Sequence, residues 1–150
     1  MDAANLFDLN RVILCHFDSY STALVFARWS NRSLLLPTPL PEGAAAMTPP
    51  AEPGAAYAGP PVMQAVIERY QIPADDIVYM DEFNEWQQTE AGPVRVHLLR
   101  FTTFEAPAAW LEPHEGVFKP LSELRGSNPG ELLLLRQVFN LIITGGGQQR

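Results

Sequence analysis

The stretch PPVMQAVIERYQI, residues 60–72, decides the fold that we expect for the chain. Pro61 suits the first position of a helix, because its fixed φ is helical and its missing N–H would have no partner there. Pro73 ends the helix, because the residue before a proline is driven out of the helical region. Four apolar residues recur at helical spacing and form one stripe: Met63, Val66, Ile67 and Tyr70.

Short apolar runs before this helix predict three strands, over residues 11–17, 22–29 and 33–36. Polar turns separate them, and Pro37 ends the third. Because the runs are almost continuously apolar, we expect a small antiparallel unit that is buried on both faces. The first ten residues contain no such run, and we expect a loose or edge-lying start there.

The segment over residues 37–61 differs from both of its neighbours. It holds eight prolines and many alanines, and it has no apolar periodicity. This composition is typical of a long, partly extended loop. A loop of this length inside a compact domain is either functional or poorly ordered, and we favour poor order.

Two strands are predicted after the helix, over residues 77–83 and 94–104. An acidic, polar turn over residues 84–92 separates them. Apolar residues alternate with Arg95 and His97 at the start of the second strand, which is the strongest strand signal in the chain. We expect the pair to form a long hairpin.

The remaining residues predict a short strand over residues 116–121, a helical turn over residues 122–124 and a last helix. Asn128 is placed to cap that helix, with Pro129 at the first helical position and Glu131 at the third. Four apolar residues are expected on its buried face: Leu135, Val138, Phe139 and Ile142.

The order of these elements indicates one domain over residues 1–150, of the α/β class in the broad sense that includes α+β. Three strands, a loop, a helix, two strands, a short strand and a helix follow one another. A mixed sheet with a helix on each face fits that order best.

Composition excludes several classes of function. The net charge is −7 and the pI is about 4.8, which argues against binding to duplex nucleic acid or an anionic membrane. No apolar run approaches the ~20 residues of a membrane span. The single Cys15 lies in an apolar run and is expected to be a buried, inert thiol. Acidic residues stand where a signal peptide needs a basic start, so we expect a cytoplasmic protein.

Five segments, taken in order, resemble parts of a Nudix domain over residues 10–143. They match the strand and proline before the family's loop, the loop's Glu-any-Gly, the Nudix helix, the strand that follows it, and the late strand with its PL-x-EL turn. The segments are SLLLP at 33–37, Glu52-Pro53-Gly54, MQAVIERYQI at 63–72, PADDIVYMDEF at 73–83 and HEGVFKPLSEL at 114–124. The resemblance implies an α/β/α sandwich, with a mixed sheet between two helices.

The catalytic signature of that family is largely missing. It reads G-x5-E-x7-R-E-U-x-E-E-x-G-U, with U aliphatic, and its carboxylates hold Mg²⁺ against a diphosphate. With Ile72 at the final aliphatic position, Glu68 falls on the first Glu of the Glu-Glu pair and Arg69 on the second. The other signature positions hold Gln64, Ala65, Gln71 and Ala56, or Ala55 if one residue is inserted. One carboxylate of about four remains, so the resemblance does not imply ordinary Nudix hydrolysis.

Four residues are candidates for ligand binding, and none is a candidate for catalysis or for a metal site. The arginine, together with Arg95 and His97, could meet a nucleotide phosphate. Each candidate also has an ordinary structural explanation: a solvated helix face or loop for the two acids, a solvated hairpin tip for the tryptophan, and cross-strand pairing for the arginine. The candidates are Glu68, Arg100, Glu115 and Trp86.

Three hypotheses follow. The first is a catalytically degenerate Nudix-like domain without a cofactor, which binds a nucleotide-like small molecule or a protein partner. The second is a divergent Nudix-type hydrolase of a nucleoside diphosphate derivative, with Mg²⁺ held by Glu68, Glu115 and the acids of residues 81–85. The third is an interaction module, a homodimer that uses Trp86, Trp110 or the Pro/Ala loop as its contact surface.

Overall fold

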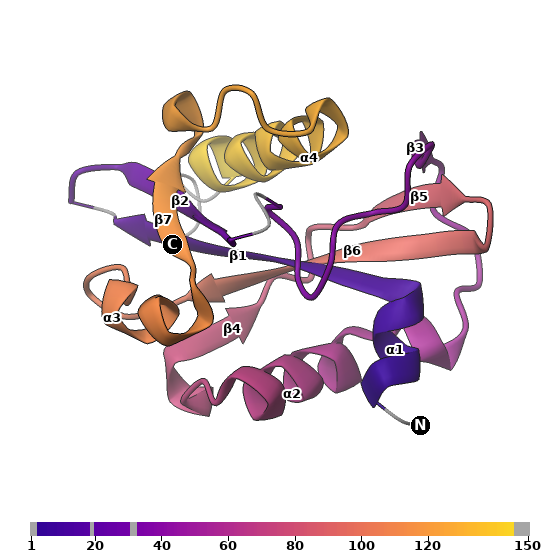
Figure 1. Cartoon of the computed structure of the whole chain (residues 1–150), viewed down its shortest axis with the longest axis horizontal. Coiled ribbons are helices and arrows are strands. Elements are labelled where there is room, and N and C mark those ends of the chain that lie inside the picture. Colours follow the sequence, from indigo (N-terminus) through magenta and orange to yellow (C-terminus); the bar gives the residue numbers. More distant parts are fainter. Residues whose placement is uncertain (1–2, 19, 31–32, 146–150) are drawn as a thin grey trace.

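The computed structural model describes residues 3–18, 20–30 and 33–145 (Figure 1). Two long strands, β1 (Asn10–Asp18) and β6 (Gly92–Phe101), lie parallel at the centre of a seven-stranded sheet. β1 also pairs antiparallel with β2 (Ala23–Arg28), and β2 pairs antiparallel with β7 (Val117–Pro120) at one edge. The predicted mixed sheet is therefore confirmed.

The other side of β6 carries the hairpin, in a different form from the one predicted. β4 (Ile77–Tyr79) pairs with the end of β6, β5 (Glu85–Thr89) pairs with its start, and β3 (Ala45–Met47) adds to β5. The single strand predicted over residues 77–83 is wrong, because a turn closed by a bond from Phe83 N–H to Met80 O (3.2 Å) interrupts it. The predicted acidic turn over residues 84–92 instead contains β5.

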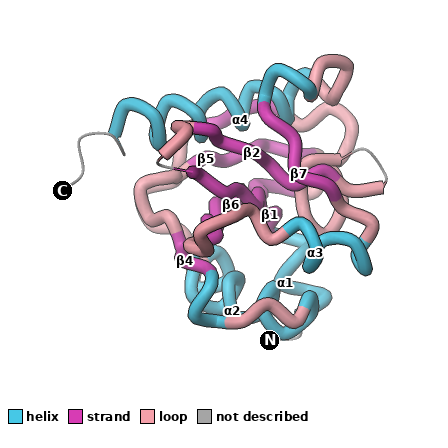
Figure 2. The backbone as a smooth tube through the Cα atoms, turned by 90° about the vertical axis from the view of Figure 1, so that its left-hand side faces the viewer, coloured by secondary structure: helices cyan, strands magenta, loops and turns pink. Residues whose placement is uncertain are grey.

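Helices cover both faces of the sheet (Figure 2). α1 (Ala3–Leu9) and α2 (Gly59–Tyr70) lie against one face, and α4 (Pro129–Asn140) lies against the other. Side chains of β1 alternate between two hydrophobic clusters, with Val12 and Leu14 in the cluster of α1 and α2, and Ile13 and Cys15 in the cluster of α4. This alternation follows from the pleat of a strand.

The N-terminal helix corrects the prediction of a loose start. Leu6 and Phe7 on α1 are 7% and 4% exposed and belong to the same cluster as Val62 and Val66 of α2. Burial of this apolar pair holds the short helix against the sheet, since a helix of seven residues is marginal in water by itself.

The third predicted strand, over residues 33–36, is not a strand. The segment is buried, but it forms only a bridge between Leu36 and Val12 of β1. Side chains take the place of a ladder, because Leu34 N–H donates to Glu131 Oε1 (3.0 Å) and Leu35 N–H donates to Ser33 Oγ (3.1 Å). The N–H groups of Leu34 and Leu35 thus have partners without a strand ladder.

The proline-rich segment over residues 37–61 contains β3, a 3₁₀ turn (Ala55–Tyr57) and the first residues of α2. Tyr57 fastens it to the sheet. The ring centroid of Tyr57 lies 4.7 Å from that of Trp86, and its hydroxyl donates to Pro93 O (2.8 Å). Arg95 Nη1 in turn donates to Tyr57 O (3.1 Å). We expected this segment to be poorly ordered, but these contacts attach it to β5 and β6.

The two long helices mostly follow their predicted faces. On α2, Val66 of the predicted stripe is fully buried, and the adjacent Val62, which the stripe omitted, is buried too. On α4, the predicted Leu135 and Val138 are buried together with Leu134, and the predicted Ile142 is buried in the π-helical turn that follows (Leu141–Gly145). Phe139 is the exception at 40% exposed. It lies at the side of the buried face and not at its centre, because the 3.6-residue repeat turns it away from Leu134 and Val138.

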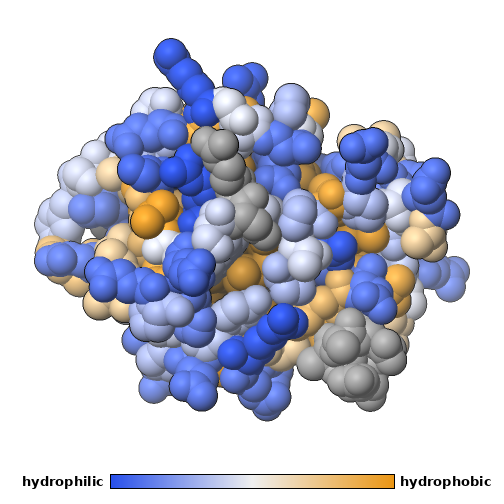
Figure 3. Space-filling view, viewed as in Figure 1, coloured by the Kyte–Doolittle hydropathy of each residue, from blue (hydrophilic) through white to orange (hydrophobic). Residues whose placement is uncertain are grey.

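The surface is mainly polar on the side that Figure 3 shows, with hydrophobic residues scattered between hydrophilic ones. No helix within the described part of the chain has the length and apolar character to cross a membrane. The described large hydrophobic side chains that remain exposed are Tyr20, Val78, Phe104, Val117, Leu133 and Phe139.

Candidate functional site

The four predicted ligand-binding residues lie in separate places. Glu68 is exposed on α2, and Arg100 is half-buried on β6. Glu115 is exposed in the loop after the 3₁₀ turn Glu112–His114. Trp86 is 1% exposed, stacks near Tyr57 and donates its indole N–H to Asn84 Oδ1 (2.8 Å). Glu68 and Arg100 line different cavities, and neither of these cavities is lined by Glu115 or Trp86.

Glu68 is hydrogen-bonded within its own helix. Its Oε2 accepts a hydrogen bond from Gln64 Nε2 (2.9 Å) one turn earlier on α2. The cavity beside it has a volume of about 470 Å³ and is mostly apolar, with Leu6, Ala55, Ala56, Pro61 and Ala65 in its wall. Among the residues that the structure describes, no three His, Cys, Asp or Glu side chains gather as a metal site would require.

Arg69, next to Glu68, packs against aromatic rings. Its guanidinium carbon lies 5.7 Å from the ring centroids of both Phe7 and Tyr70. Tyr70 also contacts His114, with ring centroids 5.4 Å apart, so the loop that carries Glu115 lies beside the end of α2. The second Glu position of the signature therefore holds a cation engaged in packing.

A buried polar network lies beneath α1 and α2. Asn10 Nδ2 donates to Leu6 O (2.8 Å) and to Ala56 O (2.9 Å), which uses both of its hydrogens. Its Oδ1 must therefore accept from His97 Nε2 (2.6 Å). His97 Nδ1 is then left without a hydrogen and accepts from the Tyr79 hydroxyl.

Electrostatics agrees with this neutral form of the imidazole. Burial, and secondarily the charge of Arg95, lowers the pKa of His97 to about 3. Burial also raises the pKa of Tyr79 above its ordinary value. The sequence allowed His97 to meet a phosphate, but the side chain is fully buried and is not available for that contact. The network joins β1, β4 and β6, and each polar side-chain atom of Asn10, Tyr79 and His97 already has a partner.

Arg100 lies in a cavity of about 350 Å³ at the carboxyl ends of β1 and β6, which we call the Arg100 pocket. Because β1 and β6 are parallel, the residues that follow the two strands meet at one edge of the sheet. Tyr20 follows β1 and Phe104 follows β6, and they are 85% and 74% exposed. Their ring centroids are 5.9 Å apart in an edge-on arrangement. With Val78 of β4, three of the exposed large hydrophobic side chains in the described chain line this one pocket.

The polar groups of the Arg100 pocket have both signs of charge. The Arg100 guanidinium carbon lies 5.5 Å from the ring centroid of Phe17, which holds it beside the pocket. Asp18 Oδ1 accepts from the backbone N–H of Tyr20 (2.9 Å) and of Ser21 (3.4 Å), and these bonds lower the pKa of Asp18. A planar ring, an anion and an N–H donor each find a complementary group here.

Sequence reasoning named Arg100 but missed Tyr20 and Phe104. A signal was present, since Tyr20 lies in the turn after the strand predicted over residues 11–17, and Phe104 is the last residue of the strand predicted over residues 94–104. What brings them together is the parallel pairing of β1 with β6, which joins segments about 80 residues apart and has no local signature.

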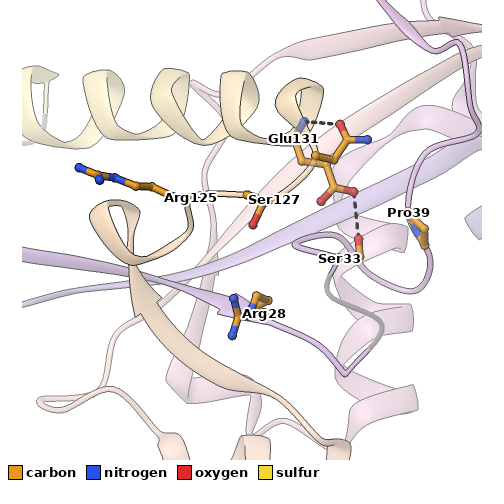
Figure 4. Close-up of a pocket in the computed structure, with 8 residues that line it drawn as sticks. Arg28, Ser33, Pro39, Arg125, Ser127 and Glu131 are labelled. Atoms are coloured by element: carbon orange, nitrogen blue, oxygen red, sulfur yellow. Dashed lines mark hydrogen bonds between the residues drawn. The ribbon is translucent and has the colours of Figure 1, made fainter.

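A second polar cavity, the α4 pocket, lies where the last helix begins (Figure 4). Its volume is about 260 Å³, and Arg28, Ser127 and Glu131 line it. Asn128 Oδ1 caps α4 by accepting from Gly130 N–H (2.8 Å) and Glu131 N–H (3.2 Å), as predicted. The carboxylate of Glu131, only 3% exposed, accepts from Ser33 Oγ (3.0 Å) and Leu34 N–H (3.0 Å).

The α4 pocket is therefore already supplied with an anion. The N–H groups at the start of the helix are bonded to Asn128, and the Glu131 carboxylate lies at the inner end. Arg125 also lines the pocket, but its side chain extends away from Ser127 in Figure 4.

No family model matches the chain, and a search of curated proteins finds no match.

Proposed function

We propose that the chain is a catalytically degenerate Nudix-like domain that binds a nucleotide-like anion without hydrolysing it. The order of its elements and a mixed sheet with helices on both faces support the Nudix-like fold. The observation that carries the binding proposal is the Arg100 pocket, where a guanidinium and two exposed aromatic rings line one cavity.

Each part of a nucleotide has a counterpart in that pocket. A base stacks on aromatic rings such as Tyr20 and Phe104, and stacking contributes about 1–3 kcal/mol per base. A phosphate is bound by the planar guanidinium of Arg100. The ionised Asp18 accepts N–H groups of a base edge. The cavity, of about 350 Å³, falls at the small end of the range for ligand sites.

The absence of hydrolysis is inferred from α2. Metal-assisted cleavage of a diphosphate needs several carboxylates around Mg²⁺. Glu68 has Gln64 and apolar residues as neighbours, and Arg69 beside it would repel a cation. The divergent hydrolase, with Mg²⁺ held by Glu68 and Glu115, is the alternative. Its support is the contact of Tyr70 with His114, which brings the loop of Glu115 to the end of α2.

We also propose that the protein is cytoplasmic and that it assembles as a homodimer. Trp86 lies in the interior and offers no surface, so an interface would use Trp110 or the proline-rich segment. Light scattering of the purified chain tests the dimer, and a monomer at all concentrations would contradict it.

Calorimetric titration with ADP, adenosine and pyrophosphate tests the binding proposal. We expect ADP to bind more tightly than either of its parts, because only ADP has both a base and phosphates. Arg100→Ala and Phe104→Ala should each weaken ADP binding by about tenfold, the lower part of the range for one charged hydrogen bond or one stacked base.

Arg69→Ala is the matched control, since Arg69 is an exposed arginine on α2, away from the pocket. It should bind ADP like the unmodified chain. An affinity of the Arg100 and Phe104 variants for ADP equal to that of the unmodified chain, or no heat of binding with any of the three compounds, would contradict the proposal.

A further inference from the structure

The outer flank of α4 forms a further concave surface, separate from the Arg100 pocket. It is a groove of about 550 Å³ between α4, the start of β2 and the end of β7. Six of its ten lining residues are apolar: Ala23, Leu24, Pro120, Leu121, Leu132 and Phe139. We call it the arginine groove, because Arg125 and Arg136 stand beside this apolar lining.

The helix repeat explains how α4 presents this surface. Leu132, Arg136 and Phe139 follow one another at spacings of four and three residues, so they line one flank of the helix. Phe139, expected in the core, is 40% exposed and contributes to the groove instead. The flank thus combines two apolar side chains with a cation between them.

The charge of the groove is opposite to that of the whole chain. The net charge is −7, yet none of the described residues that line the groove is acidic. Arg125 and Arg136 form no ion pair with any carboxylate in the described residues; the ion pair recorded there joins Lys119 to Glu123 (3.5 Å). Two uncompensated guanidiniums beside an apolar groove complement a ligand that has an anionic group and an apolar body.

We propose that the arginine groove binds a small amphipathic anion, a carboxylate with an unbranched apolar chain. The apolar chain of the ligand lies against Leu132, Leu121 and Phe139. Its carboxylate is held by Arg125 and Arg136. The volume of the groove falls within the range of about 300–1,000 Å³ that is usual for small-molecule sites.

Titration with hexanoate, octanoate and 1-octanol, followed by NMR shifts of backbone amides in α4 and β2, separates the contributions of chain and charge. Burial of two more CH₂ groups should make octanoate bind about fifteenfold more tightly than hexanoate. Octanol should bind at least about tenfold more weakly than octanoate, because it lacks the charge. Equal affinities for the two acids, or for octanoate and octanol, would overturn the proposal.

Two variants test the location. The double variant Arg125→Ala/Arg136→Ala removes exposed charges with little effect on folding, and it should weaken octanoate binding by about tenfold. Ala23→Phe, at the exposed start of β2 in the groove wall, should block the apolar part. Arg69→Ala is the control and should bind octanoate normally. Unchanged octanoate binding by either groove variant would place the ligand elsewhere and overturn the proposal.

Discussion

His97 is the residue at which the sequence and the structure differ most in chemical meaning. In the sequence it stands between two arginines on a strong strand and could serve an anion. In the fold it is fully buried, and both ring nitrogens are used, by Asn10 on one side and Tyr79 on the other. The hydrogen-bond partners come from distant segments, so the sequence alone could not predict that the imidazole is neutral.

The buried imidazole of His97 should resist protonation. Its folded pKa of about 3 lies below the ordinary value of 6.5, so between these values only the unfolded chain binds the proton. This group therefore contributes its full stability above about pH 6.5, and the contribution decreases as pH falls towards 3, by at most about 1.4 kcal/mol per pH unit.

NMR of the His97 ring carbons and nitrogens measures this directly. We expect an unchanged neutral form with hydrogen on Nε2 from pH 7 down to pH 5 in the folded protein. The same residue in urea-unfolded protein should titrate near its ordinary pKa of about 6.5. A folded-state transition near pH 6 would contradict the assignment.

At the scale of elements, the start of α2 depends on a close approach to the sheet. Gly59 begins the helix against the ring of Tyr79, and a Cβ there would lie 2.3 Å from Tyr79 Cζ. Tyr79 cannot easily retreat, because its hydroxyl is bonded to the buried His97. The sequence predicted the helix from its prolines and apolar stripe, but not the reason for a glycine at its first residue.

Gly59→Ala should therefore destabilise the fold, although alanine is the better helix former by about 1 kcal/mol. We expect a loss of about 1–3 kcal/mol in the free energy of unfolding, measured in urea, because the clash must move packed groups. In a Tyr79→Leu background the same change should cost less, which a double-mutant cycle measures.

Gly54→Ala is the matched control, since nothing lies within 4 Å of a Cβ at that position and its φ is −70°. Its effect should stay within about 0.5 kcal/mol. A loss at Gly54 as large as that at Gly59 would show that the contact with Tyr79 is not the cause.

Elements whose signals are local could be predicted from the sequence. Residues 60–72 and the Asn128 cap are examples, because prolines, caps and periodicity act within one helix. The errors arose where distant side chains decide the outcome. Glu131 bonds to Ser33 and Leu34 across the fold, so a buried apolar run became a non-strand segment. The strand predicted over residues 77–83 stops at Tyr79, because the turn between Met80 and Phe83 follows, and the next strand, β5, pairs with a different part of β6.

For the whole molecule, the mixed sheet with helices on both faces could be predicted from the sequence, whereas the Arg100 pocket could not. Arg100 was named from strand composition, but Tyr20 and Phe104 join it only through the parallel pairing of β1 with β6. Conversely, Trp86 looked like a surface anchor in an acidic stretch, and β5 places it in the interior. Composition does not determine which aromatic residues remain exposed.

The central claim is that this chain binds a nucleotide-like anion without cleaving it. ³¹P NMR of ADP-ribose mixed with the protein and Mg²⁺ tests it most directly, with Glu68→Gln, purified in the same way, as the control for contaminating hydrolases. We predict broadened or shifted diphosphate signals that keep their intensity for hours. Phosphomonoester signals that appear at a typical enzymatic rate, about 1 s⁻¹ or faster, and that Glu68→Gln abolishes, would contradict the account.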